Sequence, residues 1–197
     1  MHHAHEVLGI PILTMLVDVD PVTCSQTIPL PSLKRKSYLI REESKNYASM
    51  VLPEYTDFYT IYIQKNISFV RAAGDTNMYI LQAQWHGIQS VLPNDSICHC
   101  IVYENIHKKL VLGIYDLIQC EGESMYAKDI LCRHTTLHQC FRPNIKNGDI
   151  IIHWIGYEAA CCETLRNNKR NLPFKASRIL RLQNNEYSFV LTPLFIH

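Results

Sequence analysis

Two runs of β-branched and aromatic residues follow one another in this chain: Tyr59-Thr60-Ile61-Tyr62-Ile63 and Ile67-Ser68-Phe69-Val70-Arg71. Residues of this kind are enriched in β-strands, and Asn66 between the two runs favours a turn. Gly74-Asp75-Thr76-Asn77 supplies the next turn signal and leads into a third run at residues 78–82. This part of the chain therefore predicts consecutive β-strands.

The same pattern continues toward the C-terminus. A polar connection at 104–109 separates two apolar runs and predicts a hairpin, and Asn147-Gly148 marks a turn before another run. The further strands predicted in this half of the chain are 97–103, 110–118, 149–154, 178–182 and 187–191.

Helices are expected in two places. Apolar residues recur at helical spacing over residues 37–50, and a second helix is predicted at 126–139, with Ser124 as its N-cap. About eight strands against two or three helices predict an α+β fold built on antiparallel sheet.

Length and composition set the broad class of the protein. The chain has 197 residues, 47% of them hydrophobic, and a formal net charge of +1. These values exclude a disordered tail and a protein that grips nucleic acid by its overall charge. The first 40 residues contain four prolines, so we expect residues 1–33 to form an arm packed across a single domain at 34–197.

The eight cysteines are expected to be free thiols, most of them buried. The chain is too long to need disulfide staples, and its first six residues lack the basic charge of a secretory signal. The apolar run at 7–17 is too short to span a membrane. We therefore expect a protein of the cytoplasm or the nucleus with no membrane partner.

Two patterns of cysteine and histidine suggest chemistry but have simpler explanations. His134 and His138 are four residues apart and share a helix face, as two zinc ligands would, yet Cys132 and Cys140 point elsewhere. An amphipathic helix is favoured over a zinc site, and no metal or other cofactor is expected. In the predicted strand around His99, buried thiols are favoured over a nucleophilic cysteine.

A basic segment stands out in an otherwise balanced chain, because no acidic residue occurs from Arg166 to Leu182. Arginine and lysine in such a segment suit phosphate contact, and they equally suit an exposed, solvated loop. Both interpretations stay open at this point. The candidate phosphate or RNA contacts are Lys175, Arg178 and Arg181.

The order of these segments resembles the snurportin-type trimethylguanosine-cap-binding domain, a non-catalytic relative of messenger-RNA guanylyltransferases and nucleic-acid ligases. The resemblance covers residues 47–181 and rests on order and spacing. It implies twisted antiparallel sheets of the nucleotidyltransferase type. The matching segments are Tyr47-Ala48, Leu52-Pro53-Glu54-Tyr55, residues 64–74, Tyr79, Cys100-Ile101, Tyr115 to Gly122, and Gly148 to His153.

The departures from the catalytic relatives bear on activity. Those enzymes use Lys-x-Asp-Gly, in which the lysine attacks a phosphate, whereas this chain has Lys65-Asn66-Ile67-Ser68. The closing Lys-x-Lys pair is also missing. The resemblance therefore implies binding without catalysis, and no catalytic residue is expected.

The resemblance also implies a binding site. It places Tyr55 at a ring contact of the cap and Lys65 at the old lysine position. Arg71 is expected to face phosphates. The aromatic residue that would stack on the cap is missing near Arg178; Trp85 is the expected substitute, because Trp154 stands in an apolar strand. The candidate base-binding residues are Tyr55, Lys65, Arg71, Tyr79 and Trp85.

Three functions follow from these observations. The first is a non-catalytic module that binds an RNA cap or guanine nucleotide, as in an adaptor for maturation or nuclear import of small nuclear RNA, with a protein transport partner. The second is a diverged nucleotidyltransferase that uses Lys65. The third is a protein-interaction domain whose pocket has decayed.

Overall fold

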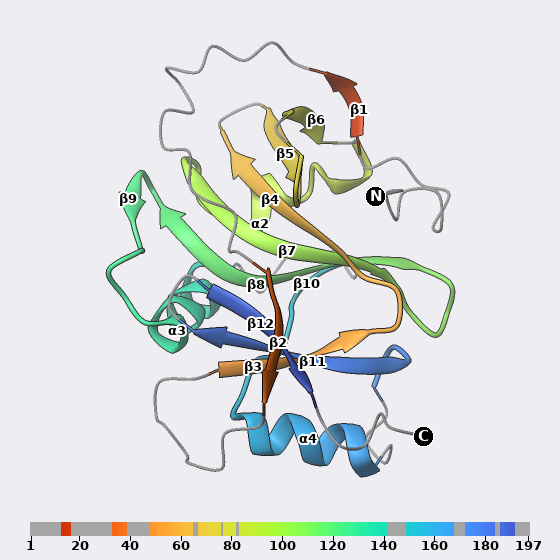
Figure 1. Ribbon diagram of the computed structural model, residues 1–197. Coiled ribbons are helices and arrows are strands. Elements are labelled where there is room, and N and C mark those ends of the chain that lie inside the picture. The colour runs from red at the N-terminus through yellow and green to blue at the C-terminus, as the bar shows by residue number, and fades with distance from the viewer. Residues whose placement is uncertain are drawn as a thin grey trace.

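The computed structural model describes residues 13–16, 33–38, 48–64, 67–75, 77–81, 83–141, 149–167, 172–183 and 186–191. These residues form a mixed α+β fold of two sheets, mostly antiparallel, with three α-helices (Figure 1). The predicted fold class is confirmed at this level. The predicted connection at 104–109 is also confirmed as a hairpin, between β7 (Ser96–Glu104) and β8 (Leu110–Cys120).

The larger sheet is built around β7 and β8. All its pairings are antiparallel except that of β10 with β8, which is parallel. β9 (Glu123–Ser124) pairs with the end of β8. The order of the other strands is β1 (Leu13–Leu16), β6 (Tyr79–Leu81), β5 (Ser68–Ala72), β4 (Asp57–Ile63), β7, β8 and β10 (Ile150–Ile152).

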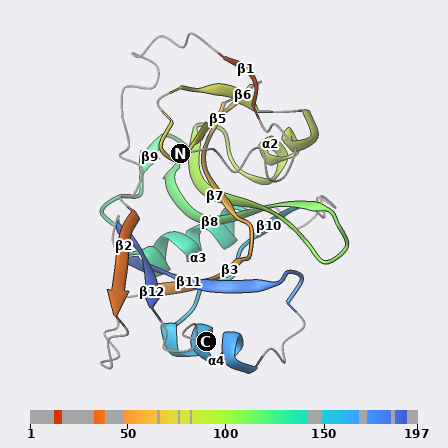
Figure 2. The same ribbon diagram turned by 45° about the vertical axis from the view of Figure 1, so that its right-hand side comes forward.

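The smaller sheet joins segments from both ends of the chain. Its order is β2 (Leu33–Tyr38), β12 (Glu186–Leu191), β11 (Ala176–Gln183) and β3 (Ala48–Pro53). The segment expected as an arm thus contributes β1 to the larger sheet, and β2 begins at its boundary. Figure 2 shows the smaller sheet below the larger one, with α4 (Glu158–Asn167) beneath it.

Two apolar clusters hold these layers together. One covers a face of the larger sheet with the short helices η1 (Ala83–Trp85) and α2 (Ile88–Val91). The other joins the facing surfaces of the two sheets and continues to α4, whose Cys161 thiol donates to the backbone oxygen of Ser49 at 3.3 Å. Burial of these side chains is the main driving force for assembling the layers.

The helix predicted at 37–50 is wrong in its described residues. Residues 37–38 end β2 and residues 48–50 begin β3, while 39–47 lie outside the described residues. β3 is fully buried and pairs with β11, and this pairing overrides the local helical spacing.

The helix predicted at 126–139 exists but begins later, as α3 (Ile130–Cys140). Its N-cap is Asp129, whose carboxylate accepts the backbone N–H of Cys132 at 2.8 Å, so the prediction of Ser124 was wrong. Helix α4 was not predicted; the residues that it buries are Cys161, Cys162 and Thr164, which form no strongly apolar helical pattern.

Candidate functional site

The facing surfaces of the two sheets meet at a buried ion pair. Arg133 of α3 donates to both carboxylate oxygens of Asp116 on β8, at 2.8 and 2.9 Å. The Tyr187 hydroxyl of β12 donates to the same carboxylate at 3.0 Å. Both charged side chains are 0% exposed. This network ties α3 and both sheets together at their junction.

A histidine continues the same polar layer. The ring Nδ1 of His99 on β7 lies 3.0 Å from the Thr60 hydroxyl of β4, and the ring stacks near Tyr115. Burial, together with the charges of Arg133 and Arg71, lowers the pKa of His99 to about 3. His99 is therefore neutral at pH 7, and its surroundings are packed protein.

Arg178 on β11 differs from Asp116, Arg133 and His99, whose side chains have hydrogen-bond partners. Its guanidinium carbon lies 4.4 Å from the centre of the Phe189 ring on β12. Its side chain is half-buried, and its Nε atom is buried with no hydrogen-bond partner among the described residues. Burial lowers its pKa, yet arginine stays charged at neutral pH. No carboxylate of the described residues forms an ion pair with it within 4.0 Å.

Tyr55 and Lys175 lie at the same end of the smaller sheet as Arg178. The backbone N–H of Glu54 donates to the Lys175 carbonyl at 2.9 Å, and the Lys175 ammonium pairs with the Glu54 carboxylate at 2.8 Å. Tyr55 is 59% exposed in the turn between β3 and β4. An exposed ring and two cations thus gather where β3 ends and β11 begins.

Arg71 and Tyr79 stand on the larger sheet. Arg71 of β5 lies opposite Thr60 of β4, and its guanidinium is 6.0 Å from the Tyr62 ring centre. It therefore shares the face of the sheet that carries Thr60 and His99. The Tyr79 hydroxyl donates to Asp75 at 3.3 Å, so it closes the turn after β5.

Two residues that were expected to contact the ligand, Trp85 and Arg181, have structural roles instead. Trp85 is 2% exposed in the core and presents no ring face to a base. Arg181 is 4% exposed and donates to both carboxylate oxygens of Glu158 at 2.7 and 2.9 Å, so its charge is already neutralised. The alternation of β11 places Arg181 toward α4 and Arg178 on the opposite face.

Lys65 lies outside the described residues. Tyr55 precedes β4, and Gln64 follows it. A strand rises about 3.3 Å per residue, so the seven residues of β4 separate its ends by roughly 20 Å. Tyr55 and the described Gln64 therefore lie near opposite ends of β4.

The cysteine and histidine motifs have structural roles in the described residues. A His134 ring nitrogen lies 3.1 Å from the backbone oxygen of His153, and the described part of the chain contains no group of three potential metal ligands. Cys98 and Cys100 are buried, and burial raises the pKa of both thiols. Their burial agrees with the sequence-based prediction, and the raised pKa disfavours the thiolate form.

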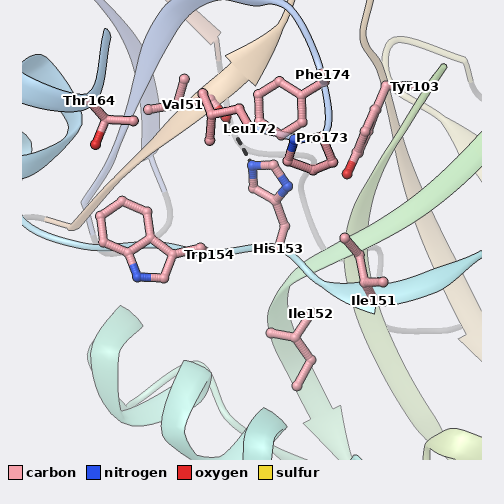
Figure 3. A pocket seen from close by; sticks show the side chains of 10 residues that line it. All are labelled: Val51, Tyr103, Ile151, Ile152, His153, Trp154, Thr164, Leu172, Pro173 and Phe174. Atoms are coloured by element: carbon pink, nitrogen blue, oxygen red, sulfur yellow. Dashed lines mark hydrogen bonds between the residues drawn. The ribbon is translucent and has the colours of Figure 1, made fainter. Parts of the chain in front are cut away.

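Trp154, predicted as a core residue, is 50% exposed. It lines a cavity of about 270 Å³ together with Phe174, His153 and Tyr103 (Figure 3). The cavity lies between the end of β10, helix α4 and the segment before β11. Trp154 directly follows the apolar β10 strand, and this position predicted a core residue.

No protein-family model and no curated protein matches this chain. The geometry and chemistry of the described residues are therefore the basis for assigning a function. Within those residues, no helix has both the length and the apolar character needed to cross a membrane.

Proposed function

We propose that this protein is a non-catalytic receptor for a phosphorylated guanine-type nucleotide, in particular the methylated cap of an RNA. The observation that carries the proposal is the state of Arg178: a half-buried guanidinium, stacked on Phe189, with a buried Nε that has no described hydrogen-bond partner. A buried cation is unfavourable unless an anion pairs with it. A phosphate oxygen supplies both the charge and the missing acceptor.

The groups around Arg178 suit the rest of such a ligand. Tyr55 offers an exposed ring on which a base can stack, and a methylated guanine carries positive charge that strengthens stacking on an electron-rich face. The Lys175 ammonium is held by the exposed Glu54 carboxylate and can exchange it for phosphate. Arg71, on the facing surface of the larger sheet, is a further candidate for phosphate contact.

Covalent nucleotide transfer is not part of the proposed function, for a chemical reason. Covalent nucleotide transfer needs an activated lysine and groups that stabilise charge on the phosphate. The motif around Lys65 lacks the Asp-Gly pair, and the buried His99 on β7 is neutral. Capped RNA and a protein transport partner, in the cytoplasm or the nucleus, remain the proposed partners.

Calorimetric titration with a trimethylguanosine cap analogue, a 7-methylguanosine cap analogue and GTP tests the proposal. We expect Arg178→Gln to weaken cap binding by about tenfold to a hundredfold, because a hydrogen bond to a charged group contributes roughly 1.5–3 kcal/mol. Lys128→Gln is the matched control, since this exposed lysine belongs to the connection between β9 and α3, which Figure 1 shows on the opposite side of the molecule from the start of β11.

Three results would overturn the proposal. Equal affinity of the Arg178→Gln variant and the unmodified protein would remove Arg178 from the site. A covalent adduct with labelled GTP that disappears in Lys65→Ala would show a nucleotidyltransferase instead. Absence of any thermal shift with the three ligands would leave the protein-interaction domain as the better account.

A further inference from the structure

The cavity beside Trp154 has a chemistry unlike that of the Arg178 region. Its volume is about 270 Å³, just below the roughly 300–1,000 Å³ of pockets for drug-sized ligands. No lysine, arginine, aspartate or glutamate is among its lining residues. Its walls are mostly apolar, with the rings of Phe174 and Trp154 among them, and its uncharged polar members are Thr164, His153 and Tyr103 (Figure 3). Such a cavity favours a neutral ligand of one or two fused rings.

One polar group in this cavity has no partner. Tyr103 of β7 is 0% exposed, and its hydroxyl has no hydrogen-bond partner among the described residues. Burial raises the pKa of Tyr103 to about 12, so the hydroxyl keeps its proton at neutral pH. Leaving a buried donor unsatisfied is unfavourable, and a ligand acceptor in the cavity would satisfy it.

The neighbouring groups fix the position of Tyr103. Its ring packs edge-on against Phe174, with ring centres 5.1 Å apart, and against His153 at 6.1 Å. A His153 ring nitrogen, Nε2, lies 2.9 Å from the Val51 carbonyl and donates to it, which holds the imidazole in place. Figure 3 shows the Tyr103 hydroxyl pointing toward the imidazole, yet no hydrogen bond joins them.

The mouth of the cavity also suits a planar ring. Trp154 is half-exposed, and its indole lies against the backbone at Gly156, where an added Cβ would come within 2.4 Å of the ring. The small residue at 156 therefore lets the indole lie flat beside the opening. A flat aromatic surface that is partly exposed to solvent is a natural stacking face for a ligand ring.

We propose that this cavity binds a small, neutral, planar heteroaromatic compound whose ring acceptor takes the hydrogen of the Tyr103 hydroxyl, while Phe174 and Trp154 contact its faces. The site is separate from the proposed nucleotide site, because it shares no residue with it and carries no charge. Ligand binding in this cavity therefore does not depend on cap binding near Arg178.

The test compares isoquinoline, which has a ring nitrogen acceptor, with naphthalene, which has the same shape and no acceptor. Binding is followed by the Trp154 indole N–H resonance in proton–nitrogen spectra. We expect isoquinoline to bind about tenfold tighter than naphthalene, as a hydrogen bond to an otherwise unsatisfied buried donor implies. In Tyr103→Phe the two affinities should become equal.

The controls separate this site from the first one. Tyr103→Phe removes only an unpartnered hydroxyl, so the variant should fold as well as the unmodified protein. Tyr126→Phe, in the loop before α3, should keep the preference for isoquinoline, and so should Arg178→Gln. Equal affinities for the two rings in the unmodified protein would refute the proposal, as would a preference that survives in Tyr103→Phe or no binding of either ring.

Discussion

Breaking the buried pair of Arg133 and Asp116 should destabilise the protein more than any exposed substitution. In Arg133→Met, the Asp116 carboxylate loses two hydrogen bonds of 2.8 and 2.9 Å and its counter-ion, and it keeps the Tyr187 hydroxyl at 3.0 Å. Burial raises the pKa of Asp116, and Arg133 opposes this rise. Removing the arginine therefore leaves a charge that is expensive to keep ionised.

The size of the effect follows from the burial. Both side chains are 0% exposed, and breaking such a pair by removing one partner costs about 3–5 kcal/mol. A chain of this length loses roughly 2–4 °C of melting temperature per kcal/mol, so Tm should fall by about 6–20 °C. Urea denaturation of the purified variant gives the free energy of unfolding directly.

A double variant separates the pair from general loss of packing. Arg133→Met combined with Asp116→Leu replaces the pair by apolar side chains of similar volume, and such exchanges are often neutral. We therefore expect the double variant to be more stable than either single variant. A loss below about 1 kcal/mol in Arg133→Met would show that the pair does not act as a buried one, because that value is typical of an exposed pair.

Three further predictions concern groups around the two sites. Burial lowers the pKa of His99 to about 3 and that of His153 to about 4, so the unfolded chain binds more protons below pH 6.5 and stability falls as the pH drops. In His99→Gln the slope of unfolding free energy between pH 6.5 and 4.5 should decrease, by up to about 1.4 kcal/mol per pH unit toward pH 4.5, and an unchanged slope would contradict a neutral histidine. Lys175→Ala should leave the midpoint of urea denaturation unchanged, because its ion pair is exposed; a clear fall would contradict this. Iodide should quench the emission of Trp154 in a Trp85→Phe variant but not that of Trp85 in a Trp154→Phe variant, and the reverse would contradict their burial.

Local sequence predicted most of the larger sheet, because its strands are short runs of β-branched and aromatic residues with turn signals between them. The pairs β4–β5 and β7–β8 follow directly from residues 59–71 and 97–118. It failed at β3, where Ala48–Pro53 owes its conformation to pairing with β11 more than a hundred positions away. A propensity pattern contains no information about such a distant partner.

The candidate site was predictable in part. The absence of acidic residues from Arg166 to Leu182 left phosphate contact and an exposed loop equally open, and the structure adds that Arg178 has no carboxylate partner among the described residues. The same pattern misjudged Arg181, because Glu158 reaches it from α4, a helix the sequence did not predict. Trp85 was expected to contact the ligand and Trp154 to lie in the core, but Trp85 is buried and Trp154 is half-exposed. The local sequence does not show which of two tryptophans the rest of the fold will cover.

Whether Arg178 binds phosphate is tested by its side-chain Nε–H resonance in proton–nitrogen spectra during titration with a trimethylguanosine cap analogue. We predict that this resonance shifts and exchanges more slowly with water as phosphate accepts its hydrogen. The Nε–H of Arg133, already bonded to Asp116, should stay in place as an internal control. An analogue that fails to bind, or that binds while the Arg178 resonance stays unchanged, would contradict the account.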